Sequence, residues 1–318
     1  MNLSAVLARR LLFSIPTVAG IAITVFVVLL LVPGNPADLI QGEMVNPEVT
    51  RSLVQKWGLD QPPLQRFVRW GTSLLRGDFG TSLVTGRPVL EMLGPRVAFS
   101  LYLGVLGIIF GILVGIPAGV VSAVKSNSAT DYSTMVVTLA GLSLPVFVTA
   151  LVLQLTFGFR LRWLPISGAA ESIFTVEMLR YALLPAVSVG LFQAAINARL
   201  VRTSMLEVLG QDYIQTARAK GLTRLRTVVR HALPNVLIPV VTLLGVYLRA
   251  VISGLLLVEI IFGWPGIGRL FYDAVRQRDY PVIQSVSLVI AIAIYAVNLV
   301  VDLVYAYLDP RVRVEAGN

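Results

Sequence analysis

Six long apolar runs constrain the fold of this 318-residue chain more than any other feature of its sequence. A helix needs roughly 20 mainly apolar residues to cross the hydrocarbon layer of a membrane. The chain is 56% hydrophobic and 14% charged, whereas about 25% of the residues of a soluble domain are charged. The sequence therefore predicts an all-α polytopic membrane protein with six transmembrane helices, at 11–32, 97–124, 132–159, 180–201, 235–260 and 282–306.

The distribution of Lys and Arg predicts the orientation of these spans. Eleven Lys and Arg residues lie on the side that holds both termini, and five lie in the two short loops on the other side. Short loops rich in Lys and Arg stay in the cytoplasm. We therefore expect a multi-pass protein of the cell (inner, cytoplasmic) membrane with both termini in the cytoplasm.

The first apolar run is expected to remain in the protein as a span. It is longer than the apolar region of a signal peptide, and no A-x-A-like cleavage site follows it. The predicted organisation has three parts. Residues 1–32 hold the N-terminus and first span, 33–96 form an extracytoplasmic insert, and 97–318 form a five-helix core that includes the cytoplasmic segment 202–234.

Composition excludes several functional classes. The chain has no Cys and a single His, His231, so disulfides, thiolate metal sites and multi-histidine metal sites are excluded. It also lacks the G-x-x-x-x-G-K-[ST] phosphate loop, which means that ATP cannot be bound in the usual way. The net charge of +9 fits basic span ends facing anionic headgroups better than it fits nucleic-acid binding.

Local signals predict two helices in the insert. Asn46-Pro47-Glu48 is typical of a helix start, and Gly58 is placed to end that helix. Pro62-Pro63 opens a second helix with an expected apolar face of Leu64, Phe67, Val68 and Leu75. Two roles remain open for the insert: a lid over the outer ends of the spans, or a docking surface for an extracytoplasmic partner.

Small residues recur every four positions in the second span, at Gly107, Gly111 and Gly115. Such a ridge lets two helices approach closely. The pattern predicts tight helix packing rather than a ligand site.

A basic segment, 202–234, separates the fourth and fifth apolar runs. Met205 to Lys220 is compatible with a helix, and Gly221 interrupts it. Thr223 is placed to cap a second short helix, Arg224 to Ala232, which is expected to stop before Pro234. Basic character alone is typical of a helix adsorbed on anionic lipid. The spacing indicates instead a slim, rigid elbow that fits a groove on another protein.

That spacing resembles the EAA loop of ABC importer permeases, in which EAA is followed by three residues, Gly, nine residues and I-x-L-P. Here the positions hold Gln215-Thr216-Ala217, Gly221 and His231-Ala232-Leu233-Pro234. The Glu and Ile of the motif are replaced, and its first Ala is Thr. Further stretches in matching order make nearly the whole chain similar to the first-type permease subunit of the dipeptide/oligopeptide/nickel importer family: PGNPA at 33–37, GLDQPPLQRFVRW at 58–70, GDFGTSL at 77–83, EIIFGWPGIG at 259–268 and DPRVR at 309–313.

The resemblance implies a type I ABC importer permease fold with an extracytoplasmic helical insert after the first span. It implies half of a translocation pathway for di- or oligopeptides, in a heterodimer with a paralogous second permease subunit. Two cytoplasmic ABC ATPases would bind ATP and Mg, and an extracytoplasmic substrate-binding protein would deliver the solute. The chain itself would be non-catalytic and would hold no cofactor or metal. The residues that would couple to the ATPases are Gln215, Thr216, Ala217, Gly221, Leu222 and Pro234.

Polar groups inside predicted spans are candidates for function by default. Gln193, Asn197, Arg249 and Glu259 are therefore hypothetical pathway or gate residues. The competing interpretation is that Arg249 and Glu259 reach the membrane interface or pair structurally.

Other functions remain alternatives. A permease for nickel, glutathione or another small solute would show the same motifs. An ion-gradient secondary transporter would show internal repeats and broken helices with ion ligands, and no convincing repeat relates 1–159 to 160–318. A membrane enzyme would need a catalytic motif, and neither H-E-x-x-H nor G-x-S-x-G occurs. A receptor or scaffold would leave the EAA-like spacing unexplained.

Overall fold

The computed structural model describes residues 3–32, 37 and 46–308, with side chains except at 3–13, 238, 242–246, 248–254, 300 and 302–308. Contacts between Cα atoms divide the chain into two compact units. Unit 1 comprises Met1–Ala98 and Gly266–Asn318, and unit 2 comprises Phe99–Pro265. Each hydrophobic cluster lies within one of the two units.

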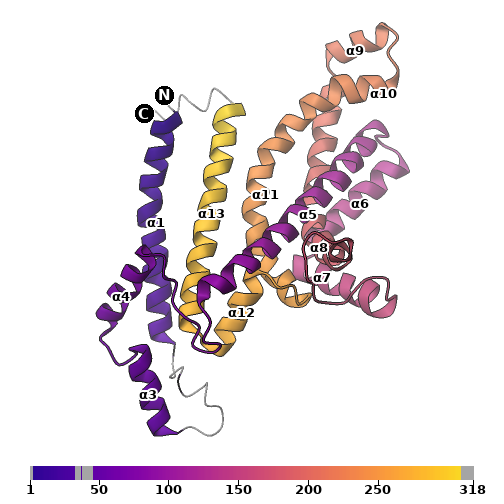
Figure 1. The fold of residues 1–318 in the computed structure, drawn as a ribbon. Helices are drawn as coiled ribbons and strands as arrows, with labels where there is room; N and C mark the ends of the chain where they lie inside the picture. The colour runs from indigo at the N-terminus through magenta and orange to yellow at the C-terminus, as the bar shows by residue number, and fades with distance from the viewer. Residues whose placement is uncertain (1–2, 33–36, 38–45, 309–318) are drawn as a thin grey trace. The chain divides into compact units, whose positions relative to one another are not determined.

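Unit 1 is built on two long helices, α1 (Leu3–Leu31) and α13 (Tyr280–Leu308), which run side by side (Figure 1). The shorter α12 (Ile267–Gln277) packs against α13. The start of α5 (Val89–Val124) also belongs to this unit. The buried core of unit 1 consists of Val89, Leu93, Leu270, Ala274, Tyr280, Val282, Ile283 and Val286.

Both predicted helices of the insert are confirmed. In α3 (Pro47–Trp57), the Asn46 side chain accepts a hydrogen bond from the Glu48 amide, and Gly58 ends the helix at φ +65°. The second helix, α4 (Pro63–Leu75), starts at the predicted proline pair. Glycine suits the end of α3 because residues with a side chain rarely adopt the positive φ found at Gly58.

The predicted apolar face of α4 is only partly covered. Phe67 packs edge-on against Phe26 of α1, with ring centroids 5.2 Å apart, and Trp70 stacks on the same ring at 6.2 Å. Leu64, Val68 and Leu75 are exposed, which the sequence pattern did not predict. Of the four predicted residues, only Phe67 packs on Phe26, and the second ring in this contact is that of Trp70, which was not among them.

The GDFGTSL stretch forms a strap, residues 77–83, that is fastened to the start of α13. The buried Asp279 carboxylate accepts hydrogen bonds from Ser82 Oγ at 2.5 Å and from the Leu83 amide at 3.0 Å. Ser285 Oγ donates to the Phe79 carbonyl at 2.9 Å. These bonds fix the strap within unit 1.

Unit 2 contains most of α5 together with α6 (Ala129–Ser143), α7 (Val146–Leu153), η1 (Gln154–Arg160), α8 (Val176–Leu209) and α11 (Leu233–Ile261). One of its cores includes Leu103, Met178, Leu184, Val258, Phe262 and Trp264. The other includes Ala123, Val201, Met205, Ile214, Val228, Ala232, Val236 and Val240. Because α8 and α11 contribute to both cores, they form the frame of the unit.

The third predicted span, 132–159, is not one straight helix. The chain bends by 107° between α6 and the α7–η1 helix. Leu144 is extended, with φ −88° and ψ 126°, and Pro145 follows it. A residue before proline is disfavoured in the helical conformation, and proline has no N–H to continue the helix.

The glycine ridge packs α5 tightly against α8, as predicted. A Cβ added at Gly115 would lie 2.5 Å from the Ala194 carbonyl oxygen, and one at Gly119 would lie 2.5 Å from that of Ala198. Gly119 therefore extends the ridge by one turn beyond the predicted residues. Only residues without a side chain permit this approach between the two backbones.

Four helices in the described part of the chain, α1, α5, α8 and α13, are long and apolar enough to cross a membrane, and the bent α6–η1 pair can supply a fifth span. Helix α11 covers the fifth predicted run, but many of its side chains lie outside the description. The number of six spans therefore stays a prediction. Large apolar side chains such as Leu31, Leu113 and Val137 are exposed, as expected of a surface that lipid or another subunit covers.

Candidate functional site

The basic segment forms a projecting end of unit 2, where α9 (Asp212–Ala219) and α10 (Arg224–Thr227) lie beyond the long helices (Figure 1). We call residues 212–232 the elbow. The predicted helix from Met205 to Lys220 is wrong in its bounds, because α8 ends at Leu209 and α9 starts only at Asp212. Gly210 and the extended Gln211 separate the two helices.

The inner side of α9 is anchored in the core of unit 2. Ile214 is fully buried and Ala217 is 8% exposed. Gln215 and Thr216 face outward and are exposed. The structure therefore divides the predicted coupling residues of α9 into an anchor, Ala217, and two surface residues.

The turn of the elbow is set by Gly221, which has φ +80°. Its amide donates to the Arg218 carbonyl at 2.9 Å, and the half-buried Leu222 donates to the Ala217 carbonyl at 3.3 Å. Thr223 then caps α10 by accepting from the Arg226 amide at 3.4 Å, as predicted. No atom lies within 4 Å of a Cβ placed on Gly221, so the outside of the turn is open.

The second arm of the elbow does not stop before Pro234, which corrects the prediction. Helix α10 continues as the π-helical turn η2 (Val228–Ala232) and runs directly into α11. The Leu233 amide reaches the Val228 carbonyl, five residues back. This wider turn occurs immediately before exposed Pro234, which has no N–H to donate. A proline that would end an α-helix is therefore accommodated in the first turn of α11.

Two side-chain contacts fasten the elbow to neighbouring helices. Asn235 Nδ2 of α11 donates to the Tyr213 hydroxyl of α9 at 2.9 Å. Arg224 Nη2 of α10 donates to the carbonyl of Val124, the last residue of α5. The elbow is therefore connected to the ends of two long helices besides the one that precedes it.

A partly buried ion pair joins the same ends of α5, α6 and α8. Arg202 Nε and Nη2 donate to the two carboxylate oxygens of Asp131 at 2.7 and 2.8 Å. Ser122 Oγ and the Asn127 amide also donate to this carboxylate. We call Asp131, Arg202 and Ser122 the Asp131 clamp. Bidentate, charge-assisted hydrogen bonds are both strong and directional, so the clamp fixes the three helix ends relative to one another.

The sequence reasoning missed the clamp. Arg202 contributed only to the charge count, and Asp131 was not singled out. A local signal was present for Asp131, because Ser128 and Asp131 have the spacing of a helix N-terminus in which the first side chain caps the backbone amide of the second residue. Ser128 Oγ does accept from the Asp131 amide, at 3.3 Å. The pairing with Arg202, 71 residues away, has no such local signal.

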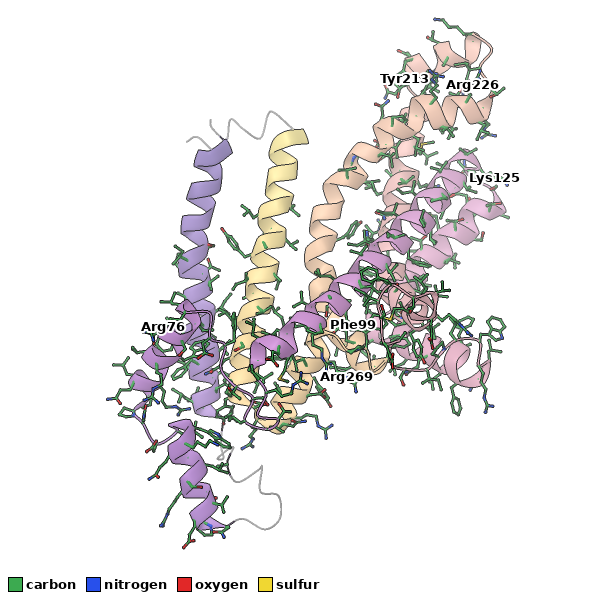
Figure 2. The ribbon with its side chains drawn as sticks, in the orientation of Figure 1. Arg76, Phe99, Lys125, Tyr213, Arg226 and Arg269 are labelled. Carbon is green, nitrogen blue, oxygen red and sulfur yellow. The ribbon has the colours of Figure 1, made fainter. Side chains whose placement is uncertain are left out.

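The outer surface of the elbow combines apolar and cationic side chains. Tyr213, Leu225 and Val229 are exposed, and Leu225 reaches 74% exposure. Arg218, Arg226 and Arg230 are also exposed. Figure 2 shows Tyr213 and Arg226 on this projecting end. A surface that mixes exposed apolar and cationic side chains is typical of one that binds a groove on another protein, rather than of one that remains in contact with solvent.

The predicted pathway residues Gln193 and Asn197 lie one turn apart in the α5–α8 contact. Asn197 Nδ2 donates to the Gly111 carbonyl at 3.1 Å, and the Gln193 side chain packs on the same glycine. Both amide atoms of Gln193 and Oδ1 of Asn197 are buried without a hydrogen bond. Such atoms are costly to bury without a partner.

Glu259 and Arg249 belong to α11, whereas Gln193 and Asn197 belong to α8. Glu259 is fully buried and accepts a hydrogen bond from Ser100 Oγ of α5 at 2.5 Å. The side chain of Arg249 lies outside the described residues. The structure thus places Gln193 and Asn197 together, and it gives Glu259 a contact with Ser100 of α5.

A cavity of about 280 Å³ lies between α5, α6 and α8. Apolar residues such as Val114, Val137 and Leu191 line most of it, together with Ser133, Thr134 and Thr138, whereas Gln193 and Asn197 do not. In the described part of the chain, no three His, Asp or Glu side chains come together in a way that would hold a metal ion.

Comparisons with known proteins identify the family. Residues 115–314 match the family described as the binding-protein-dependent transport system inner membrane component. The dipeptide transport system permease protein DppB of Alkalihalophilus pseudofirmus is 41% identical, with 96% of this chain and 98% of the relative covered. DppB of Escherichia coli K12 is 38% identical, with 96% and 97% covered. The glutathione transport system permease protein GsiC of Salmonella typhi is 39% identical, with 96% and 97% covered.

The fold also has a counterpart among solved structures. Inward facing conformations of the MetNI methionine ABC transporter align with TM-scores of 0.54 and 0.57. Each alignment covers 69% of this chain and 97% of the other, at 17% and 18% identity. This likeness supports the type I permease fold, and the relatives confirm the resemblance seen in the spaced motifs. The chain therefore belongs to the family of inner membrane components of binding-protein-dependent transport systems.

Proposed function

We propose that this protein is the permease subunit of an ATP-driven importer for di- or oligopeptides. Relatives named for dipeptide and glutathione transport cover nearly the whole chain. These solutes are all small peptides, which favours a peptide over nickel or another small solute. The chain contributes half of the translocation pathway and performs no covalent chemistry.

The proposed partners follow from the family and from the elbow. A paralogous second permease completes the pathway, and two ABC ATPases bind ATP and Mg in the cytoplasm. An extracytoplasmic binding protein delivers the peptide, and the insert at 33–96 is a lid or the docking surface for that protein. Both termini lie in the cytoplasm, on the same side as the elbow.

The observation that carries the mechanism is the anchored elbow with an open outer surface. The exposed Gln215 and Thr216, together with the open side of Gly221, contact a cleft of the ATPase. The buried Ala217 and the Asp131 clamp connect that contact to the long helices of unit 2. Closure of the ATPases on ATP moves the elbow, and the pathway then opens outward to accept peptide. Hydrolysis resets it inward.

The pathway itself is proposed to include Gln193 and Asn197, with Arg249 and Glu259 as gate residues. The amide atoms of Gln193 and Asn197 that lack hydrogen bonds support this role, because they can bond to a peptide or to water that reaches them. The mainly apolar cavity between α5, α6 and α8 provides adjacent space.

Reconstitution tests the proposal. Liposomes containing this chain, the second permease and the ATPases, supplied with the binding protein, should take up radiolabelled dipeptide only with ATP. Parallel assays with nickel and with glutathione address the alternatives. ATP-dependent uptake of nickel without peptide would overturn the peptide assignment. Uptake of any solute by this chain alone, without ATPases, would overturn the importer model.

A further inference from the structure

A cavity of about 240 Å³ lies within unit 1, between the end of α3, α4, the strap and the start of α13. It is separate from the elbow and from the α5–α8 contact, which belong to unit 2. Its walls are unusually aromatic. The rings that line it are those of Phe26, Trp57, Trp70, Phe79 and Tyr280.

The polar residues of this cavity include Arg66, Arg69, Trp70, Ser73, Asp78, Tyr280 and Gln284. Three of them, Arg66, Arg69 and Trp70, can only donate hydrogen bonds through their side chains. The guanidinium groups of Arg66 and Arg69 line it, and neither forms an ion pair with any residue that the structure describes. The indole N–H of Trp70 is buried and has no acceptor. The one carboxylate in the lining, Asp78, already accepts from the Gly80 amide at 2.8 Å. Burial lowers the pKa of the Arg66 guanidinium, as expected for a cation without a nearby counter-charge.

The position of the cavity along α1 relates it to the membrane. Phe26 lies five residues before Leu31, the last residue of α1, which corresponds to roughly 7.5 Å along a helix. The neighbouring Val27 and Val28 are exposed apolar residues of the same candidate span. On α4, Leu64 and Val68 are exposed as well. The cavity is therefore next to the part of a spanning helix where hydrocarbon gives way to headgroups, and Trp, Tyr and Arg are enriched at that level.

We propose that this cavity binds the headgroup of an anionic phospholipid, with α4 lying in the membrane interface. The lipid phosphate accepts hydrogen bonds from Arg66, Arg69 and the Trp70 indole. The acyl chains lie along the exposed apolar residues at the end of α1. A free anion would satisfy the donors, but it would leave the aromatic walls and the adjoining apolar surface uncovered. With both termini in the cytoplasm, as proposed above, this headgroup belongs to a lipid of the outer leaflet, and no other part of the inference depends on that orientation.

Native mass spectrometry of the purified full-length chain tests this site without ATP, peptide or partner subunits. The chain is equilibrated in detergent with equal amounts of phosphatidylglycerol and phosphatidylcholine. We expect phosphatidylglycerol to be retained preferentially, and the double variant Arg66→Gln/Arg69→Gln to lower its affinity by about tenfold, since charge-assisted hydrogen bonds to phosphate are lost. The matched control is Arg51→Gln/Lys56→Gln, which removes the same charge from α3 away from the cavity and should leave retention unchanged.

The same measurement can overturn the proposal. Equal loss of lipid in both double variants, or retention in both, would show that the cavity is not the site. Displacement of the lipid by inorganic phosphate at equal concentration would assign the site to a free anion instead. Trp70→Phe keeps an aromatic side chain but removes the N–H donor, and it should weaken retention several-fold. This variant keeps the test decisive if the arginine variant does not fold. These lipid measurements do not involve peptide, so they remain interpretable even if the chain does not transport peptides.

Discussion

The elbow of unit 2 and the insert helices of unit 1 are built alike but are held differently. Each is a pair of short helices joined at a glycine with positive φ, Gly221 in the elbow and Gly58 in the insert. The elbow buries Ile214 and Ala217 on α9, and Thr227 on α10. Helices α3 and α4 bury no residue fully. An anchored pair can transmit a displacement to the helices behind it, whereas a lightly held pair can adapt to its surroundings.

The largest expected effect is on the clamp that supports the elbow. Asp131→Ala removes the carboxylate and leaves Arg202 without its partner. Arg202 is only one-quarter exposed, and we expect a loss of about 3 kcal/mol in the free energy of unfolding. Unfolding of the wild type and the variant in detergent with increasing denaturant measures this difference in the free energy of unfolding.

The matched control for the clamp is an exposed ion pair in unit 1. Arg269 and Asp273 lie 3.8 Å apart and are nearly half exposed. Asp273→Ala should cost less than about 1 kcal/mol. Equal losses for the two variants would contradict a special role of the clamp.

The next largest effect is expected in the α5–α8 contact. Gly119→Ala places a Cβ 2.5 Å from the Ala198 carbonyl oxygen, and backbone cannot move aside as a flexible side chain can. We expect a loss of about 2 kcal/mol, typical of an overpacked site, in the same unfolding measurement. Gly141→Ala meets its nearest atom at 3.4 Å, an ordinary contact, and should be tolerated. A neutral Gly119→Ala would mean that the helices are farther apart.

An intermediate effect, on coupling rather than stability, is expected at the turn of the elbow. Gly221→Trp and Gly77→Trp introduce the same side chain at φ +80° and +79°, with open space around both. The backbone strain is therefore matched, at about 1–2 kcal/mol. Only Gly221→Trp should obstruct the ATPase, and we expect roughly tenfold weaker binding, equivalent to about 1.4 kcal/mol. Copurification of the ATPase and peptide-stimulated hydrolysis are the measurements. Equal effects of the two variants would indicate strain alone.

The smallest effect is expected from two equally exposed leucines, Leu225 of the elbow and Leu64 of the insert, each at 74%. Replacing either by Ser should change stability by less than about 0.5 kcal/mol. Leu225→Ser should weaken ATPase binding a few-fold, because it removes an apolar contact. Leu64→Ser should leave ATPase binding unchanged. Titration of the purified ATPase onto each variant measures the affinity of the complex. Weaker ATPase binding by Leu64→Ser would contradict the assignment of ATPase contact to the elbow alone.

Features that depend on neighbouring residues could be predicted from the sequence. Asn46, Gly58 and Pro63 set the insert helices through their own backbone preferences, and Gly221 and Thr223 set the elbow in the same way. The packing of the glycine ridge could also be predicted, because a four-residue period places small residues on one helix face.

Features that depend on distant partners could not be predicted. The contact between Asp131 and Arg202 joins residues 71 positions apart. Which residues of α4 are covered depends on where Phe26 of α1 lies. The passage of the helix through Pro234 required a π-helical turn, and local proline rules predict a stop instead.

The π-helical turn has a mechanical consequence. From Arg224 to Ile261 the backbone is helical without an intervening loop, a rod of roughly 57 Å at 1.5 Å per residue. A displacement of the elbow can therefore pass along α11 to Glu259, which accepts a hydrogen bond from Ser100 of α5. Pro239, inside α11, is the point at which this rod can bend, so the stiffness of the helix at Pro239 sets how much of the displacement reaches Glu259.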